Sequence, residues 1–132
     1  MRRNFYGNVL VLAFCFAIEL SSSGSLLAEH IETNVVYGMY SGLALLMDVH
    51  YPDKPNGYSI VFIPGSGWTA PLAFDAPPLK DNTVGDGPKK LANGGYTVFV
   101  INHRATPRFQ YPAPLEDAQR AVRFIRSNAA TY

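Results

Sequence analysis

The most informative segment of the chain is VFIPGSGW, at residues 61–68. A short apolar run breaks here into a glycine-rich turn that ends in the only tryptophan of the chain. Glycine permits the close approach and the unusual φ values of such a turn, so that backbone N–H groups can point at a ligand. The stretch therefore predicts a buried strand that ends in an anion-binding turn.

The sequence around this turn has the pattern of an α/β sheet. Residues 58–63 and 96–102 are apolar on both faces, as central parallel strands covered by helices are. Residues 34–40 and 43–51 are β-rich and are separated by the turn signal Ser41-Gly42, which predicts an antiparallel hairpin. A short helix over residues 88–92 lies between the two apolar strands. Hairpin, strand, helix, strand and helix in this order indicate an α/β fold.

The clearest predicted helix begins at Pro114 and continues to the end of the chain at Tyr132. Its first turn carries Glu116 and Asp117, which complement the positive end of the helix dipole. Residues 68–88 lack periodicity and contain four prolines, so we expect a long surface loop that forms a binding wall. The apolar stripe of the helix is expected to comprise Leu115, Ala118, Val122, Ile125 and Ala129.

Charge and composition narrow the class of protein. A formal net charge of +1 with 48% hydrophobic residues fits one globular domain and gives no electrostatic case for nucleic acid binding. The single cysteine, Cys15, lies in an N-terminal apolar run, so the remaining domain would have no disulfide and no cysteine metal site.

The first 28 residues have the order of a secretory signal peptide. Arg2 and Arg3 precede an apolar run, which a stretch of small residues follows. The run is shorter than the roughly 20 apolar residues that span a bilayer, so no stable membrane anchor is expected. We therefore expect export to the periplasm or the medium, with residues 29–132 forming one partial domain.

Four segments together resemble the N-terminal part of the α/β-hydrolase fold, in particular the secreted esterases and lipases whose oxyanion loop reads His-Gly-Gly-Gly-Trp. The segments are residues 46–52, 62–68, 95–104 and 111–118. The resemblance implies an incomplete α/β-hydrolase sheet, with an antiparallel hairpin followed by parallel strands and crossover helices. It also implies a small-molecule or polysaccharide ester substrate, with no metal and no organic cofactor.

In this family the turn stabilises the charge that builds on an ester carbonyl during attack. The resemblance assigns the donors to the backbone N–H groups of Ser66 and Gly67, the bend to Gly65 and a pocket wall to Trp68. Two positions depart from the family, because Pro64 replaces the leading histidine and Ser66 replaces the middle glycine. The Ser66 hydroxyl could itself donate to the oxyanion.

The catalytic triad is expected beyond Tyr132, in the order serine, acid, histidine. Ser66 is not the predicted nucleophile, because the nucleophile elbow needs glycines two residues away on either side and Pro64 and Trp68 stand there. The chain by itself is therefore predicted to be inactive. Without its downstream partner, the strand at residues 58–63 would be an apolar edge.

Several polar residues have competing interpretations. Arg104 and Asp117 match a family pair that ties a strand end to the next helix, so we expect a structural ion pair. His50 and His103 could form a base or metal pair, but a structural role is favoured because spacing places no carboxylate near them. His30 is expected to be disordered and Asp48 to be a solvated or hairpin residue. The alternative to an esterase is a small exported binding protein, or a relic of a hydrolase, that performs no chemistry.

Overall fold

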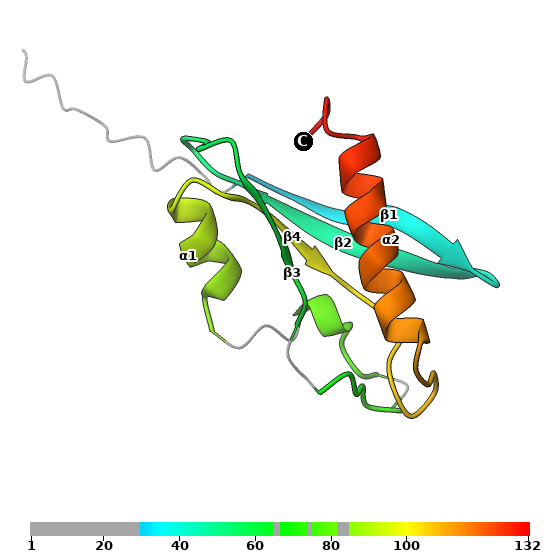
Figure 1. Cartoon of the computed structure of the whole chain (residues 1–132). Helices are drawn as coiled ribbons and strands as arrows, with labels where there is room; N and C mark the ends of the chain where they lie inside the picture. Colours follow the sequence, from blue (N-terminus) through cyan, green and yellow to red (C-terminus); the bar gives the residue numbers. More distant parts are fainter. Residues whose placement is uncertain (1–29, 65–66, 74, 82–84) are drawn as a thin grey trace, which may run out of the picture.

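A computed structural model describes residues 30–64, 67–73, 75–81 and 85–132 (Figure 1). The predicted signal peptide, Gly65 and Ser66 lie outside these residues. Within the described ranges, no helix is long and apolar enough to cross a membrane. The elements in chain order are β1 (His30–Tyr40), β2 (Leu43–Tyr51), β3 (Ser59–Phe62), the 3₁₀ turn η1 (Leu79–Asp81), α1 (Gly87–Asn93), β4 (Thr97–Ile101) and α2 (Ala113–Ser127).

The four strands form one sheet in the order β1-β2-β4-β3. β1 and β2 pair antiparallel, which confirms the predicted hairpin, and β3 and β4 pair parallel across the α1 crossover. β2 and β4 are antiparallel neighbours and join the two halves. In the described sheet β3 has a neighbouring strand on one side only, so it is an edge strand there and not the central strand that its apolar pattern predicts.

The hairpin turn follows from two left-handed residues. Ser41 has φ 46° and Gly42 has φ 83°. Positive φ at both central residues is the requirement of the two-residue turn whose twist matches that of the flanking strands. Glycine meets this requirement without steric cost, which is why Ser41-Gly42 predicts the turn. The register of the hairpin was not predicted, and it shifts between Glu32 and Val35 and between Val36 and Gly38.

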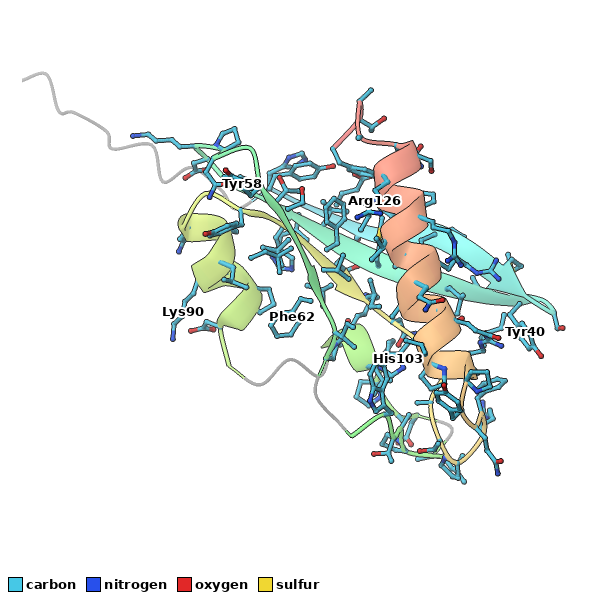
Figure 2. The ribbon with its side chains drawn as sticks, in the orientation of Figure 1. Tyr40, Tyr58, Phe62, Lys90, His103 and Arg126 are labelled. Atoms are coloured by element: carbon cyan, nitrogen blue, oxygen red, sulfur yellow. The ribbon has the colours of Figure 1, made fainter. Side chains whose placement is uncertain are left out.

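One helix covers each face of the sheet (Figure 1). Alternation along β4 divides its side chains, so that Phe99 and Ile101 pack in the cluster with Ala121 of α2. Val98 and Val100 pack in a second cluster with Ala92 of α1. Figure 2 places Phe62 of β3 on the α1 side, where it packs against that second cluster. Val98–Ile101 are buried, so β4 is the central strand that the sequence predicts. The same prediction for residues 58–63 is wrong for the described structure, because no residue of β3 is buried.

The buried stripe of α2 differs from the predicted one by about one residue. Pro114, Asp117 and Ala121 are buried, whereas Leu115 is 40% exposed. The predicted stripe contained only apolar residues and therefore left out Asp117. As a result, the predicted buried face is rotated relative to the observed one. The helix also ends at Ser127, where Asn128 donates its side-chain amide to the Phe124 carbonyl at 2.8 Å, rather than continuing to Tyr132.

His30 is ordered, contrary to the expectation for a residue beside the predicted cleavage point. It is the first residue of β1, pairs with Tyr51 in the sheet and stacks on its ring, with 4.8 Å between the ring centroids. The sheet thus includes the chain from His30 onwards, because the pairing with β2 supplies hydrogen bonds that a free terminus would lack.

Tyr51 provides a pH-dependent contribution to stability. Burial, together with the hydrogen bond that its hydroxyl donates to Glu32 at 2.9 Å, raises the pKa of Tyr51 to about 12. The folded state therefore prefers the protonated phenol, since the ordinary tyrosine pKa is about 10. The resulting stabilisation is complete below about pH 10 and is lost as the pH rises through about 12.

A spectrophotometric titration of phenolate absorbance checks this assignment. We expect one ionisation step near pH 12 that disappears in Tyr51→Phe and moves toward lower pH in Glu32→Gln, which keeps the size but not the charge. Absorbance curves that are the same in the wild type and in Tyr51→Phe throughout this pH range would contradict it.

Candidate active site

The turn after β3 holds two successive residues in the left-handed region. Gly67 has φ 60° and Trp68 has φ 65°. Glycine adopts this conformation freely, but for a bulky side chain it costs roughly 1–2 kcal/mol. Strain of this kind persists only where the surroundings fix the backbone, and it is concentrated at functional sites.

The backbone around Trp68 is fixed by the segment that follows β4. The Trp68 carbonyl accepts a hydrogen bond from the Thr106 N–H at 2.9 Å and a second from the Thr106 hydroxyl at 3.1 Å. The Ala70 N–H in turn donates to the Thr106 carbonyl at 2.9 Å. These bonds form a short parallel bridge between residues 69 and 106. The predicted oxyanion turn is therefore attached to the end of the central strand.

His103 packs against the ring of Trp68. Its ring centroid lies 5.1 Å from that of Trp68 at an interplanar angle of 60°, and its exposed fraction is 5%. Nδ1 lies 2.9 Å from the Arg104 carbonyl, so it is the protonated nitrogen, while Nε2 has no partner within the described structure. His103 lies near the start of α2 in Figure 2, and its position is that of a buried support rather than a group open to solvent.

Arg104 and Asp117 are in direct contact inside the protein. Asp117 is 0% exposed and accepts four hydrogen bonds from Arg104. One comes from the backbone N–H at 2.8 Å, two from Nε at 2.9 and 3.1 Å and one from a terminal guanidinium nitrogen at 2.8 Å. These bonds hold the pKa of Arg104 above its ordinary value. The guanidinium also lies 3.9 Å from the centre of the Tyr40 ring, within reach of a cation–π contact.

The proline-rich loop is anchored at η1, which the sequence did not predict. Lys80 is buried, and its ammonium lies 2.9 Å from Asp48 and 3.0 Å from Asp81. Burial by itself lowers the pKa of Lys80, but the hydrogen bonds to the two carboxylates outweigh it and leave the pKa raised. Beside it, the Leu79 N–H donates to the Asn102 side chain at 3.0 Å.

Asp48 is accordingly not a solvated residue. Its side chain is 14% exposed, and its second oxygen accepts a hydrogen bond from the Asn34 N–H at 2.8 Å across the hairpin. Asn34 itself has φ 60°, at the irregularity where the β1–β2 register shifts. The carboxylate in a largely apolar strand was the only sequence signal for this anchor, and nothing in the loop indicated Lys80 as its partner.

A cavity of about 390 Å³ lies between the two loops described above. Residues 70–79 supply mainly alanine and proline, and the segment after β4 supplies Asn102, His103 and Arg108. Binding sites for small molecules commonly combine an apolar lining with a few polar groups at volumes of roughly 300–1,000 Å³. Gly67 and Trp68 do not line this cavity, but His103, which does, contacts the Trp68 ring. No group of three potential metal ligands occurs within the described ranges.

The structure thus brings together Trp68, His103, Arg104 and Asp117, while Ser66 and Gly65 fall outside the described residues. Thr106 and Lys80 were missed by sequence reasoning. For Thr106 no signal existed, because its role depends on a backbone that approaches from 38 residues earlier in the chain.

Comparison with known proteins adds a family match. The model of a family described as BD-FAE matches residues 47–132. A kynurenine formamidase of Meyerozyma guilliermondii is 32% identical over 82 residues, which are 61% of this chain and 28% of that protein.

Solved structures give a consistent picture. A bifunctional GH43-CE protein of Bacteroides eggerthii aligns with a TM-score of 0.61 and 32% identity, over 77% of this chain and 14% of its own. A truncated carbohydrate esterase from gut microbiota aligns with a TM-score of 0.58 and 30% identity, over 78% of this chain and 35% of that protein. Esterase 2 of Thermogutta terrifontis aligns with a TM-score of 0.58 over 76% and 37%, and its 22% identity supports the fold alone. The chain thus spans well under half the length of each of these proteins.

Proposed function

The chain belongs to the BD-FAE family of α/β-hydrolase esterases, and from this premise we propose that it is the N-terminal part of a serine carboxylic-ester hydrolase. The α/β-hydrolase fold that the sequence predicts is confirmed by the structural relatives. The observation that carries the proposal is the clamped left-handed turn at Gly67 and Trp68, at the end of β3.

The turn serves acyl transfer in the proposed reaction. When a nucleophile attacks an ester carbonyl, negative charge develops on the oxygen, and fixed N–H donors stabilise that charge. Ser66 and Gly67 would supply these donors from the backbone, Gly65 would permit the bend, and Trp68, which is 43% exposed, would form a wall of the substrate pocket. Serine, acid and base would follow beyond Tyr132.

The proposed substrate class is acylated carbohydrate. Two relatives of 30% identity or more carry the abbreviation CE or the words carbohydrate esterase in their descriptions. The cavity beside the turn, with polar groups on one side and an apolar loop on the other, suits an acylated sugar. Export by the N-terminal segment would bring the enzyme to polysaccharides outside the cell.

A serine-reactive fluorophosphonate tests this proposal on the full-length gene product. We expect the probe to label a serine within a Gly-x-Ser-x-Gly sequence after residue 132, and the same protein to hydrolyse a short-chain nitrophenyl ester. Mass spectrometry of the labelled, exported protein should place its N-terminus near residue 29. Heat-denatured protein is the control for non-specific labelling.

A full-length product that is folded, unlabelled and inactive toward esters would contradict the proposal. In that case the binding-protein alternative, in which the Trp68 loop holds a ligand without chemistry, becomes the better account. Release of acetate from an acetylated polysaccharide, compared with release from the nitrophenyl ester, separates the carbohydrate substrate from a general esterase activity.

A further inference from the structure

We propose that Thr106 is a positioning residue of the oxyanion turn, whose hydroxyl holds Trp68 in its left-handed conformation and so places the Gly67 amide. This inference rests on the proposed ester hydrolysis. It assigns to Thr106 a role in turnover through another residue, not contact with the substrate.

The first step is the strain at Trp68. With φ 65°, this residue lies in a region that bulky side chains avoid, so without restraint it would relax. The chain after it is held, because the Ala70 N–H donates to the Thr106 carbonyl. Rotation about the backbone bonds of Trp68 would therefore move Gly67 relative to Ala70, which is held in place. A small change in the Trp68 backbone thus moves the predicted donor.

The second step is the number of donors on one oxygen. The Trp68 carbonyl accepts from both the N–H and the hydroxyl of Thr106, at 2.9 and 3.1 Å. The N–H sets the direction of one bond, and the hydroxyl, which lies on a short branched side chain, adds a second restraint on the same peptide plane. Two bonds from one residue restrict the rotation of that plane more than one bond does.

The third step is the rigidity of the clamp itself. Thr106 follows Ala105, which is 5% exposed, and Arg104, whose backbone N–H and guanidinium both bond to the buried Asp117 of α2. His103, which precedes Arg104, contacts the Trp68 ring. The hydroxyl of Thr106 is thus carried by a segment fixed to the helix and to the central strand. The buried segment therefore fixes the position of the Thr106 hydroxyl, and the hydroxyl fixes the turn.

The test compares three variants of the full-length enzyme. Thr106→Val keeps the shape and both backbone hydrogen bonds but removes the hydroxyl, Thr106→Ser restores it, and Thr33→Val is a matched change on the exposed part of β1. We expect Thr106→Val to lower kcat by between about twofold and tenfold, the range that the net loss of one hydrogen bond gives, with KM within about twofold of the wild type. Thr106→Ser should recover most of kcat, and Thr33→Val should not change it.

Inhibition by a trifluoromethyl ketone distinguishes a role in positioning the oxyanion turn from a purely structural role, which would leave the inhibition constant unchanged. The tetrahedral adduct of the ketone with the serine places an oxyanion at the turn, so the inhibition constant should rise in Thr106→Val by the same factor by which kcat/KM falls. Unchanged kcat in Thr106→Val, or a loss that Thr106→Ser does not recover, would overturn the proposal. A wild-type enzyme that neither hydrolyses esters nor reacts with the fluorophosphonate would instead overturn the proposed function.

The Trp68 ring supplies an additional check. Trp68→Ala removes the ring contact with His103. Alanine still has a Cβ, so the left-handed backbone at position 68 remains strained. The Thr106 hydroxyl then becomes the more important restraint on this backbone. Thr106→Val should therefore lower kcat by a larger factor in the Trp68→Ala background than in the wild type. Equal factors in both backgrounds would show that the two restraints act independently and would contradict a shared role at the turn.

Discussion

Replacement of Asp117 by alanine is expected to lower the free energy of unfolding by about 3–5 kcal/mol, because it leaves the Arg104 guanidinium buried without its principal partner. The side chain of Arg104 is 3% exposed and that of Asp117 is 0% exposed, so water cannot replace the lost carboxylate. Most domains have only about 5–15 kcal/mol of stability in total. Urea denaturation of the full-length protein, followed by circular dichroism, measures the change.

Glu116→Ala is the matched control for this prediction. Glu116 contacts the same guanidinium at 3.2 Å, but its side chain is 55% exposed, so its removal should cost less than about 1 kcal/mol. Asp117→Asn keeps the size and serves if the alanine variant does not fold. Equal losses in Glu116→Ala and Asp117→Ala would show that burial does not decide the strength of this pair.

The 132-residue chain purified by itself is expected to turn over esters at least about 10⁵-fold more slowly than the full-length protein. A preorganised oxyanion donor contributes roughly 2.7–4 kcal/mol to the transition state, but it cannot attack a carbonyl. Loss of the serine or of its base alone costs about 10⁶ in kcat in a well-studied serine protease. The 132-residue sequence contains no Gly-x-Ser-x-Gly that could supply the nucleophilic serine.

Folding of the isolated chain must be verified in the same experiment. β3 presents an apolar edge in the described sheet, and Tyr58 beside it is 71% exposed (Figure 2), so part of the protein is expected to aggregate. The soluble monomer from size exclusion is therefore assayed. Turnover by this monomer at a rate close to that of the full-length protein would contradict the prediction and place a nucleophile within residues 1–132.

Local patterns were sufficient for the order and type of the main elements. Ser41-Gly42 predicted the hairpin turn, and the doubly apolar run at residues 96–102 predicted the central strand, which is β4 in the structure. The phase of α2 was predicted wrongly at Leu115 because Asp117 occupies a core position. A carboxylate can lie there only because Arg104 neutralises it, and no periodicity in one helix contains that information.

The hairpin, the parallel βαβ unit and the glycine turn after β3 are all predictable from the sequence, because turn chemistry and side-chain alternation act between neighbours in the chain. Only the three-dimensional fold brings Thr106 to Trp68 and Lys80 to Asp48. It also shows that the ion pair expected from the family resemblance, Arg104 with Asp117, lies inside the protein. These contacts join residues separated by 38, 32 and 13 positions. They form because the sheet places β4 between β2 and β3, so that the segments that follow β3 and β4 lie close together and hydrogen bonds and ion pairs can hold them.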